Sequence, residues 1–363
     1  MNEEPESILL PAEAEPLPST QIWIGPGVLE RADRLLRSPS GRFVLVSPPG
    51  ARAAADRVRR ALAGGLIADI ALDDREASKN LAAIEAIADR ALEAGLRRDD
   101  AVVAVGGGVT SDVAGFAAAV LLRGVAWNAV PTTTGAMADA AIGGKTGVDH
   151  RAGKNLIGAF HPPRTVLIDP RAAEGLPERD FRAGLVEAFK AAWIADAGLA
   201  AASRSAIDRI LAREERALTS LLAGAARVKA DIVASDPRES GLRRLLNFGH
   251  TLGHALEAAG GYERLRHGEA VAWGICAAVE ISRRRAGLSA SESASIREVL
   301  VRLGPFPEPD RDPGRLAPFL ARDKKATAAG LAAVLLEAVG RARVHEGVPA
   351  TEWLDAAAIM SLK

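Results

Sequence analysis

The stretch AVVAVGGGVTSDVAG, residues 101–115, predicts the fold class of the amino-terminal half of the chain. AVVAV is a short apolar run typical of a buried parallel strand, and Gly106, Gly107 and Gly108 follow it directly. Ser111 or Asp112 can begin the next helix. Glycines let a backbone approach a phosphate, and helix amides attract it. The spacing is neither GxGxxG nor a Walker loop, so a tight structural turn with Asp112 as helix cap remains an open alternative.

On either side of this stretch, short apolar runs alternate with helical segments. FVLV (43–46), WNAV (127–130) and TVLID (165–169) resemble strands, and Ala/Arg-rich helices are expected near 51–64 and 78–95. After Leu176 the strand signals fade, and Ala/Leu-rich segments at helical spacing follow. We therefore expect an α/β protein with a disordered tail (1–18), a Rossmann-like, mostly parallel sheet domain (19–175) and an all-helical C-terminal domain (176–363).

The composition excludes several classes of partner. Forty-six Lys and Arg residues balance 46 Asp and Glu, so no overall field would attract nucleic acid or an anionic membrane. No run approaches the roughly 20 apolar residues of a membrane helix. The acidic, Pro-rich N-terminus lacks the basic start and apolar core of a secretory signal, which predicts a cytoplasmic protein. Cys276 lies in the apolar run VAWGICAAVEI and is expected to be a buried hydrophobe.

A second glycine-rich segment, PTTTGAMADAAIGGKTGVDHRAGKNLIGAFHPP (131–163), is expected to be a long loop. A loop of this length in a compact domain is usually functional, although each polar residue alone could simply be solvated. Lysines, hydroxyls and glycine amides suit a phosphate or carboxylate ligand. The candidate binding residues are Thr132, Thr133, Asp139, Lys145, Lys154 and Asn155.

The helical half carries a candidate metal site. In LVEAFKAAW, Glu187 and Lys190 are three residues apart and share a helix face, and in GHTLGHALE so do His250 and His254, four apart. RHGEAV adds His267. A lone helical histidine is usually structural, but this cluster with a carboxylate suits a divalent metal with open coordination positions, such as zinc or cobalt. Spacing alone selects His250 and His254 as the ligand pair.

Several segments together resemble the 3-dehydroquinate synthases of the sugar phosphate cyclase family. These segments are GGGVTSDVAGF, the whole 131–163 stretch, GLVEAFK, GLRRLLNFGHTLGHALE, LRHGEAV and DKK, and the match runs from about Ile22 to Gly347. The resemblance implies that Glu187, His250 and His267 hold the metal. His254 then becomes a substrate-site residue, which replaces the pair selected by spacing.

The resemblance also implies the other ligand-binding residues. NAD would be bound by Glu76, Lys79, Gly107, Gly108, Asp112, Thr132, Thr133, Asp139, Lys145 and Lys154. The substrate phosphate would meet Lys145, Asn155, Asn247 and His254, together with Arg123 from a second subunit of a homodimer. The substrate carboxylate would meet Lys229 and Arg243, with Lys324 or Lys325 near. Lys190 would contact a substrate hydroxyl, and Glu239 would orient its basic neighbours.

The implied activity belongs to the shikimate pathway, which leads to chorismate and the aromatic amino acids. The small-molecule substrate would be 3-deoxy-D-arabino-heptulosonate 7-phosphate, and the products 3-dehydroquinate and phosphate. The reaction would begin with a transient oxidation of the substrate by NAD, followed by elimination of phosphate and re-reduction. Ring opening and an intramolecular aldol closure would complete it. The protein would mainly position the substrate and stabilise its charge.

The sequence departs from the family pattern in three places. Ser47, Pro48 and Pro49 stand where a carboxylate commonly holds the adenosine ribose, Arg75 replaces a glycine, and Thr134 stands where leucine is common. Pro48 offers neither a carboxylate nor an amide. We expect NAD to bind more weakly, and Arg75 raises the hypothesis of a phosphorylated nicotinamide cofactor.

Three rival readings remain. A related cyclase could act on another sugar phosphate to make a cyclitol, but Lys229 and Arg243 favour a substrate with a carboxylate. A metal-dependent polyol dehydrogenase would share the architecture, but its substrates lack the phosphate that Lys145, Asn155 and Arg123 suit. A binding protein without activity is the third reading, and the complete set of metal and phosphate residues opposes it.

Overall fold

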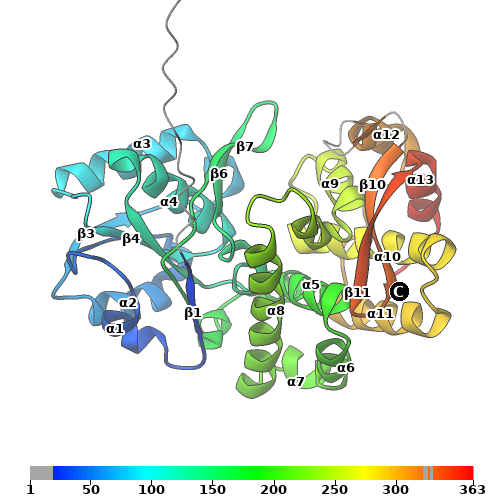
Figure 1. Ribbon diagram of the computed structural model, residues 1–363, viewed down its shortest axis with the longest axis horizontal. Helices are drawn as coiled ribbons and strands as arrows, with labels where there is room; N and C mark the ends of the chain where they lie inside the picture. Colours follow the sequence, from blue (N-terminus) through cyan, green and yellow to red (C-terminus); the bar gives the residue numbers. More distant parts are fainter. Residues whose placement is uncertain (1–18, 322–325, 328–329, 363) are drawn as a thin grey trace, which may run out of the picture.

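The computed structural model describes residues 19–321, 326–327 and 330–362. A six-stranded parallel sheet with the order β1-β8-β5-β4-β2-β3 forms the N-terminal domain (Figure 1). Its strands are β1 (Gln21–Ile24), β2 (Phe43–Ser47), β3 (Leu66–Ala71), β4 (Ala101–Gly106), β5 (Ala126–Pro131) and β8 (Thr165–Ile168). The helices of this domain are α1 (Ala32–Leu35), α2 (Arg52–Ala61), α3 (Leu81–Glu93) and α4 (Gly108–Val120). The parallel α/β prediction is confirmed.

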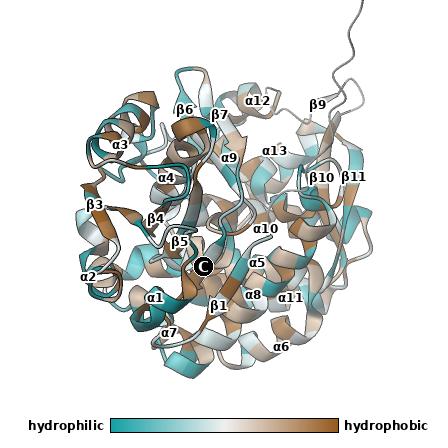
Figure 2. Ribbon diagram, turned by 60° about the vertical axis from the view of Figure 1, so that its left-hand side comes forward, coloured by the Kyte–Doolittle hydropathy of each residue, from teal (hydrophilic) through white to brown (hydrophobic). Residues whose placement is uncertain are grey.

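The sheet is covered on both faces, because alternate residues of its central strands belong to two separate cores. Val44, Val102 and Ala104 pack with apolar residues of α3 and α4. Phe43, Leu45, Val103 and Val105 pack instead with apolar residues of α1 and α2. This two-residue period explains why both strands are apolar throughout. In Figure 2 the outer helices α2 and α3 carry both hydrophilic and hydrophobic residues.

The 131–163 segment is more ordered than the long loop that we predicted. It contains a π-helical turn (Ala136–Ala140) and a hairpin of β6 (Lys145–His150) and β7 (Gly153–Phe160). Gly147 and Gly158 are register partners in this hairpin, and a Cβ on Gly158 would lie 2.1 Å from the carbonyl oxygen of Thr146. The glycines that suggested a flexible loop therefore allow two strands to pair closely.

The C-terminal domain is built mainly of helices, as predicted. They are α5 (Glu178–Ala195), α6 (Ala197–Ser205), α7 (Ile207–Leu211), α8 (Glu215–Ser235), α9 (His250–Ala259), α10 (His267–Arg285), α11 (Ala290–Leu303), α12 (Pro313–Ala321) and α13 (Ala350–Ile359). The predicted boundary between 175 and 176 falls in the segment that links β8 to α5. No helix within the described ranges combines the length and apolarity needed to cross a membrane.

The prediction that this domain is entirely helical was wrong for its last part. A three-stranded antiparallel sheet contains β9 (Ala326–Thr327), β10 (Gly330–Ala338) and β11 (Arg341–Val348). The run GLAAVLLEA of β10 consists largely of good helix formers, but the backbone amide of Leu336 donates to Ser282 Oγ of α10 at 3.0 Å. Packing against α10 therefore overrides the local helix propensity.

Candidate active site at the domain junction

The glycine turn after β4 leaves the first amides of α4 without a side-chain cap. Gly107 is the N-cap residue of α4, and no side chain caps this helix. Our expectation that Ser111 or Asp112 would begin the helix was wrong, because α4 already starts at Gly108. Thr132 and Thr133 follow the neighbouring strand β5, and the Thr132 amide donates to the Gly106 carbonyl at 2.9 Å. The uncapped amides and the two threonines thus lie at the same edge of the sheet, where a phosphate fits.

Asp112 does not cap α4 but pairs with a buried lysine. Its Oδ2 lies 2.5 Å from Nζ of Lys79, a lysine that is 4% exposed. The same ammonium group donates to Asn155 Oδ1 of β7. Desolvation raises the pKa of Asp112 to about 6, although the charge of Lys79 opposes this shift. Lys79 therefore joins α4 to the β6–β7 hairpin above the glycine turn.

Three helices of the C-terminal domain converge to form the candidate metal site. Glu187 lies on α5, His250 begins α9 and His267 begins α10. Gly249 has a φ of +79°, and a Cβ there would lie 2.5 Å from Ile275 Cγ1. A Cβ on Gly268 would lie 1.9 Å from the Ala183 carbonyl oxygen. Glycine at these two positions permits the close helix contacts that bring the three side chains together.

The distances between the three side chains suit a single ion. Nε2 of His267 and Nε2 of His250 lie 3.5 and 3.9 Å from Glu187 Oε1. The potential ligand atoms of the group all lie within 4.8 Å of one another. Two ligands of a tetrahedral zinc with bonds near 2 Å are about 3.3 Å apart. A small inward adjustment of the side chains around an ion would meet this geometry.

The hydrogen bonds of the two imidazoles orient their free nitrogens toward Glu187. Nδ1 of His250 lies 3.2 Å from the Phe248 carbonyl oxygen, and Nδ1 of His267 lies 3.1 Å from Glu257 Oε2. Because neither oxygen carries a hydrogen, each Nδ1 must be the donor. In the neutral rings the lone pairs are then on the Nε2 atoms, which face Glu187. This is the tautomer that a metal ligand requires.

The charges around Glu187 also suit a cation. Glu187 is 4% exposed, and among the described residues neither of its oxygens accepts a hydrogen bond, although Lys190 Nζ forms an ion pair with Oε2. Burial lowers the pKa of His250 well below its usual value, so this ring is neutral at pH 7. Desolvation opposes the charge of His267, but Glu257 and Glu187 raise its pKa to about 9. A carboxylate and two imidazoles are a donor set that fits zinc or cobalt.

The pair that spacing alone selected, His250 and His254, is not one of the candidate metal groups. The rings of His250 and His254 are 5.2 Å apart and nearly perpendicular. His254 belongs to a second group with Glu257 and His267. In that group the Glu257 carboxylate would be a ligand, but it is already engaged by His267 Nδ1 at 3.1 Å and by Lys154 Nζ at 3.5 Å. The structure thus favours the group with Glu187.

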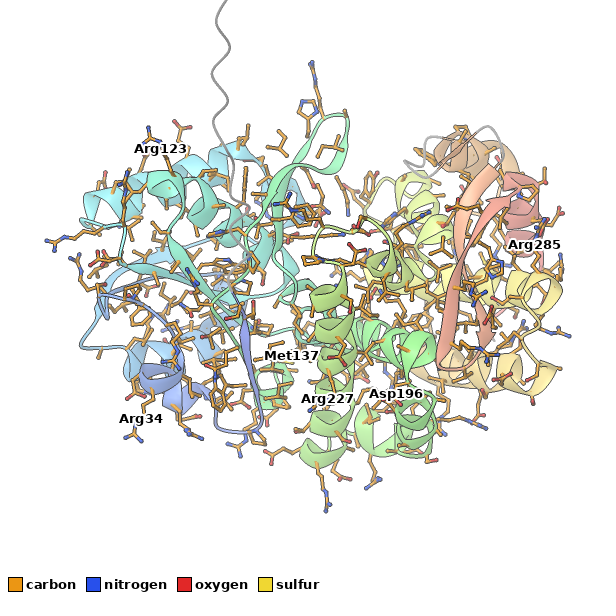
Figure 3. The ribbon with its side chains drawn as sticks, in the orientation of Figure 1. Arg34, Arg123, Met137, Asp196, Arg227 and Arg285 are labelled. Atoms are coloured by element: carbon orange, nitrogen blue, oxygen red, sulfur yellow. The ribbon has the colours of Figure 1, made fainter. Side chains whose placement is uncertain are left out.

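Two buried basic residues of the C-terminal domain, Lys229 and Arg243, contact the N-terminal domain. Asp139, in the π-helical turn, accepts from Lys229 Nζ of α8, and Lys229 and Lys190 lower its pKa despite its desolvation. Arg243 is 1% exposed and donates to the carbonyls of Pro237 at 2.6 Å and Gly143 at 3.0 Å. Figure 3 shows Met137, in the same turn as Asp139, at the junction of the two domains.

Glu239 lies between two of the predicted phosphate ligands. It accepts from Asn247 Nδ2 at 2.8 Å and from Lys145 Nζ. The backbone of Glu239 is in the left-handed region, with a φ of +59°. Lys145 at the start of β6 and Asn247 just before α9 are thus held together across the domain junction.

Lys154 also connects the two domains. Its Nζ lies 3.0 Å from Glu76 Oε1, 3.5 Å from Glu257 Oε1 and 4.7 Å from the centre of the Tyr262 ring. Glu76 belongs to the N-terminal domain, and Glu257 belongs to α9. The sequence motifs assign no role to Glu257, although it lies seven residues after His250 on the same helix. That spacing would have revealed it.

One predicted site residue is not brought to this junction, and another lies outside the described residues. Arg123 is exposed, and Figure 3 shows it at the outer surface of the N-terminal domain. Lys324, like Lys325, lies outside the described residues. Of the departures from the family pattern, Ser47 ends β2 beside β4, and Arg75 pairs with Asp73 at 2.5 Å. The charge of Arg75 is therefore already balanced locally.

Fold and site together define a two-domain enzyme in which a candidate metal centre on helices faces the glycine turn of a parallel sheet. The profiles of the 3-dehydroquinate synthase N-terminal and C-terminal families match residues 62–183 and 184–326. The chain belongs to the 3-dehydroquinate synthase family, as the sequence resemblance implied.

Individual relatives agree with this assignment. The 3-dehydroquinate synthase of Nitrosococcus oceani is 41% identical, over 91% of this chain and 93% of that protein. The enzyme of Solibacter usitatus is 40% identical, over 89% and 91% of the two chains. Among solved structures, ValA (2-epi-5-epi-valiolone synthase) from Streptomyces hygroscopicus subsp. jinggangensis, with NAD+ and Zn2+ bound, has a TM-score of 0.85 and 27% identity and covers 97% and 98% of the two chains.

Proposed function

We propose that this enzyme converts 3-deoxy-D-arabino-heptulosonate 7-phosphate into 3-dehydroquinate and phosphate, using NAD and one divalent ion, zinc or cobalt. The observation that carries the proposal is the convergence of Glu187, His250 and His267 in a domain that also buries Lys229 and Arg243. The relatives at 40% and 41% identity are named for this activity.

The cofactor would lie along the glycine turn. The amides of Gly107 and Gly108 would bind its phosphates, and Thr132, Thr133 and Lys154 would contact it from the neighbouring loops. When bound, NAD supplies a reversible hydride acceptor. Asp112 with Lys79, and Glu76 with Lys154, would fix the polar walls of this pocket. Asp139, whose neighbour Ala140 lies against Gly108, would lie where cofactor and substrate meet.

Glu187, His250 and His267 would hold the divalent ion, which when bound polarises substrate hydroxyl groups. Lys190, in contact with Glu187, would donate to one of these hydroxyls. The substrate carboxylate would be bound by Arg243 and Lys229. Hydrogen bonds to the Gly143 and Pro237 carbonyls hold the Arg243 side chain in position, and a hydrogen bond to Asp139 holds that of Lys229. Lys145, Asn155, Asn247 and His254 would bind the phosphate, with Lys324 near the substrate. This arrangement supplies charge and orientation and lowers the barrier by positioning.

A homodimer is part of the proposal, because exposed Arg123 would otherwise have no access to a phosphate. It would reach the site of the second subunit. The chain would work in the cytoplasm.

A substrate comparison tests the proposal against the cyclitol alternative. The enzyme with NAD and cobalt is given either 3-deoxy-D-arabino-heptulosonate 7-phosphate or sedoheptulose 7-phosphate, and released phosphate is measured. We expect rapid release from the first substrate only, because Arg243 and Lys229 match its carboxylate. Preferential release from sedoheptulose 7-phosphate would assign the site to cyclitol formation.

A further inference from the structure

Glu257 is a buried carboxylate in direct contact with a predicted metal ligand. Its side chain is 4% exposed, and Oε2 lies 3.1 Å from Nδ1 of His267. Glu257 lies on α9, whereas His267 begins α10. The contact therefore ties the two histidine-bearing helices together immediately beside the metal group.

The contact fixes both the orientation and the tautomer of His267. A carboxylate oxygen only accepts hydrogen bonds, so Nδ1 carries the hydrogen and the other nitrogen points away from Glu257. That nitrogen, Nε2, lies 3.5 Å from Glu187 Oε1. His250 has the Phe248 carbonyl in the equivalent position, but only His267 has a charged partner. A charged acceptor also makes the imidazole a stronger metal ligand.

The second oxygen of Glu257 is held as well. Lys154 Nζ lies 3.5 Å from Oε1, and this lysine is itself fixed by Glu76 and the Tyr262 ring. The Glu257 carboxylate thus has a cation on one side and an imidazole on the other. The ion pairs of this carboxylate within the described residues thus join it to one residue of the N-terminal domain and to one predicted metal ligand.

We propose that Glu257 is a positioning residue of the metal centre, which holds His267 with Nε2 directed at the ion while Lys154 holds Glu257 in place. The inference rests on the proposed function, because it takes Glu187, His250 and His267 as the ligands of a divalent ion. In this role Glu257 would act through His267 and would contact neither the ion nor the substrate.

Cobalt binding to the metal-free, full-length protein tests this role. Co2+ is titrated into the wild type, Glu257→Gln and the control Glu263→Gln, in which an exposed glutamate after the same helix is changed. Affinity and the visible absorption spectrum of bound cobalt are recorded. We expect Glu257→Gln to bind about 10- to 100-fold more weakly. Its cobalt spectrum should also change, because the ring is no longer held, while Glu263→Gln matches the wild type.

Thermal unfolding of the metal-free proteins separates positioning from folding. Glu257→Gln is expected to unfold within the range of the control, with the loss confined to the cobalt-loaded state. If Glu257→Gln does not fold, Glu257→Asp replaces it, since a shorter side chain withdraws Oε2 from Nδ1 and should cause a similar loss. Wild-type affinity and spectrum in a folded Glu257 variant would overturn the inference.

A Glu187→Gln variant in the same series distinguishes this failure from failure of the proposed function. If Glu187→Gln loses cobalt and Glu257→Gln does not, the metal site stands and the role of Glu257 is wrong. If Glu187→Gln binds cobalt like the wild type, the proposed metal site itself is wrong, and the positioning role is overturned with it.

Discussion

Nε2 of His267, at the start of α10, lies 3.5 Å from Oε1 of Glu187, on α5. The two residues are far apart in the sequence, and neither belongs to the histidine pair that helical spacing selects. Their approach depends on glycine at position 268, where any side chain would collide with the Ala183 carbonyl. The candidate metal centre is therefore a product of helix packing.

Removal of the Glu187 charge should abolish metal retention. In Glu187→Gln the carboxylate that faces both imidazoles becomes a neutral amide, which is a much weaker ligand for zinc. Metal content after gel filtration should fall to background, and turnover with it, while NAD binding measured by fluorescence remains near that of the wild type. Exposed Glu174→Gln serves as the control. Full metal content in Glu187→Gln would contradict the assignment.

Metal affinity should rise with pH up to about 9. The pKa of His267 is raised to about 9, so below that pH the ring is protonated and an entering ion must displace a proton. Affinity should therefore increase about tenfold per pH unit between 7 and 9 and level off above. Calorimetric titrations at pH 7 in buffers of different ionisation enthalpy should report about one proton released per ion. A pH-independent affinity would show that His267 is not a ligand.

Substitution of Gly108 should separate stability from cofactor binding. An added Cβ would lie 3.4 Å from that of Ala140, an ordinary contact, and alanine favours helix formation over glycine by about 0.5–1 kcal/mol. Gly108→Ala should therefore keep or raise the melting temperature. The same methyl group would stand where a phosphate approaches the backbone, so NAD affinity should fall at least about tenfold. Unchanged NAD affinity would place the cofactor elsewhere.

Replacement of Arg243 should lower kcat/KM, whereas replacement of the neighbouring Arg244 should not. Arg243→Lys cannot keep the guanidinium contacts with Gly143 and Pro237 and also bind a carboxylate in two places. Loss of one charged hydrogen bond, about 1.5–3 kcal/mol, corresponds to a drop in kcat/KM of about 10- to 100-fold. Arg244→Lys is the matched control, because Arg244 pairs with Glu346. Equal effects of both changes would refute the role of Arg243.

Mixing two inactive variants tests the shared site. Arg123→Ala lacks the residue that we expect a second subunit to receive, and Glu187→Gln lacks a metal ligand of its own subunit. After the two are unfolded and refolded together, mixed dimers contain one site with both residues intact. Partial recovery of activity is expected, and no recovery despite verified mixed dimers would place Arg123 outside the partner's site.

The sequence was sufficient for the elements whose burial follows a local pattern. AVVAV and FVLV are buried on both faces of the sheet, and their uninterrupted apolar character showed this. It was insufficient where packing overrides propensity, as in GLAAVLLEA, a strand held by Ser282 of α10. The metal-ligand role predicted for His267 rests on family resemblance and not on spacing, because a residue on a separate helix has no fixed sequence distance from the other candidate ligands. Glu257 does have a fixed helical distance from His250, seven residues on the same helix, and this spacing was the available signal for it.

The most direct test follows phosphate, 3-dehydroquinate and NADH together during incubation with 3-deoxy-D-arabino-heptulosonate 7-phosphate, NAD and cobalt. We predict equal amounts of phosphate and 3-dehydroquinate, no net NADH, and complete loss of turnover with a chelator. Net accumulation of NADH without phosphate release would contradict the account and assign the site to a polyol dehydrogenase.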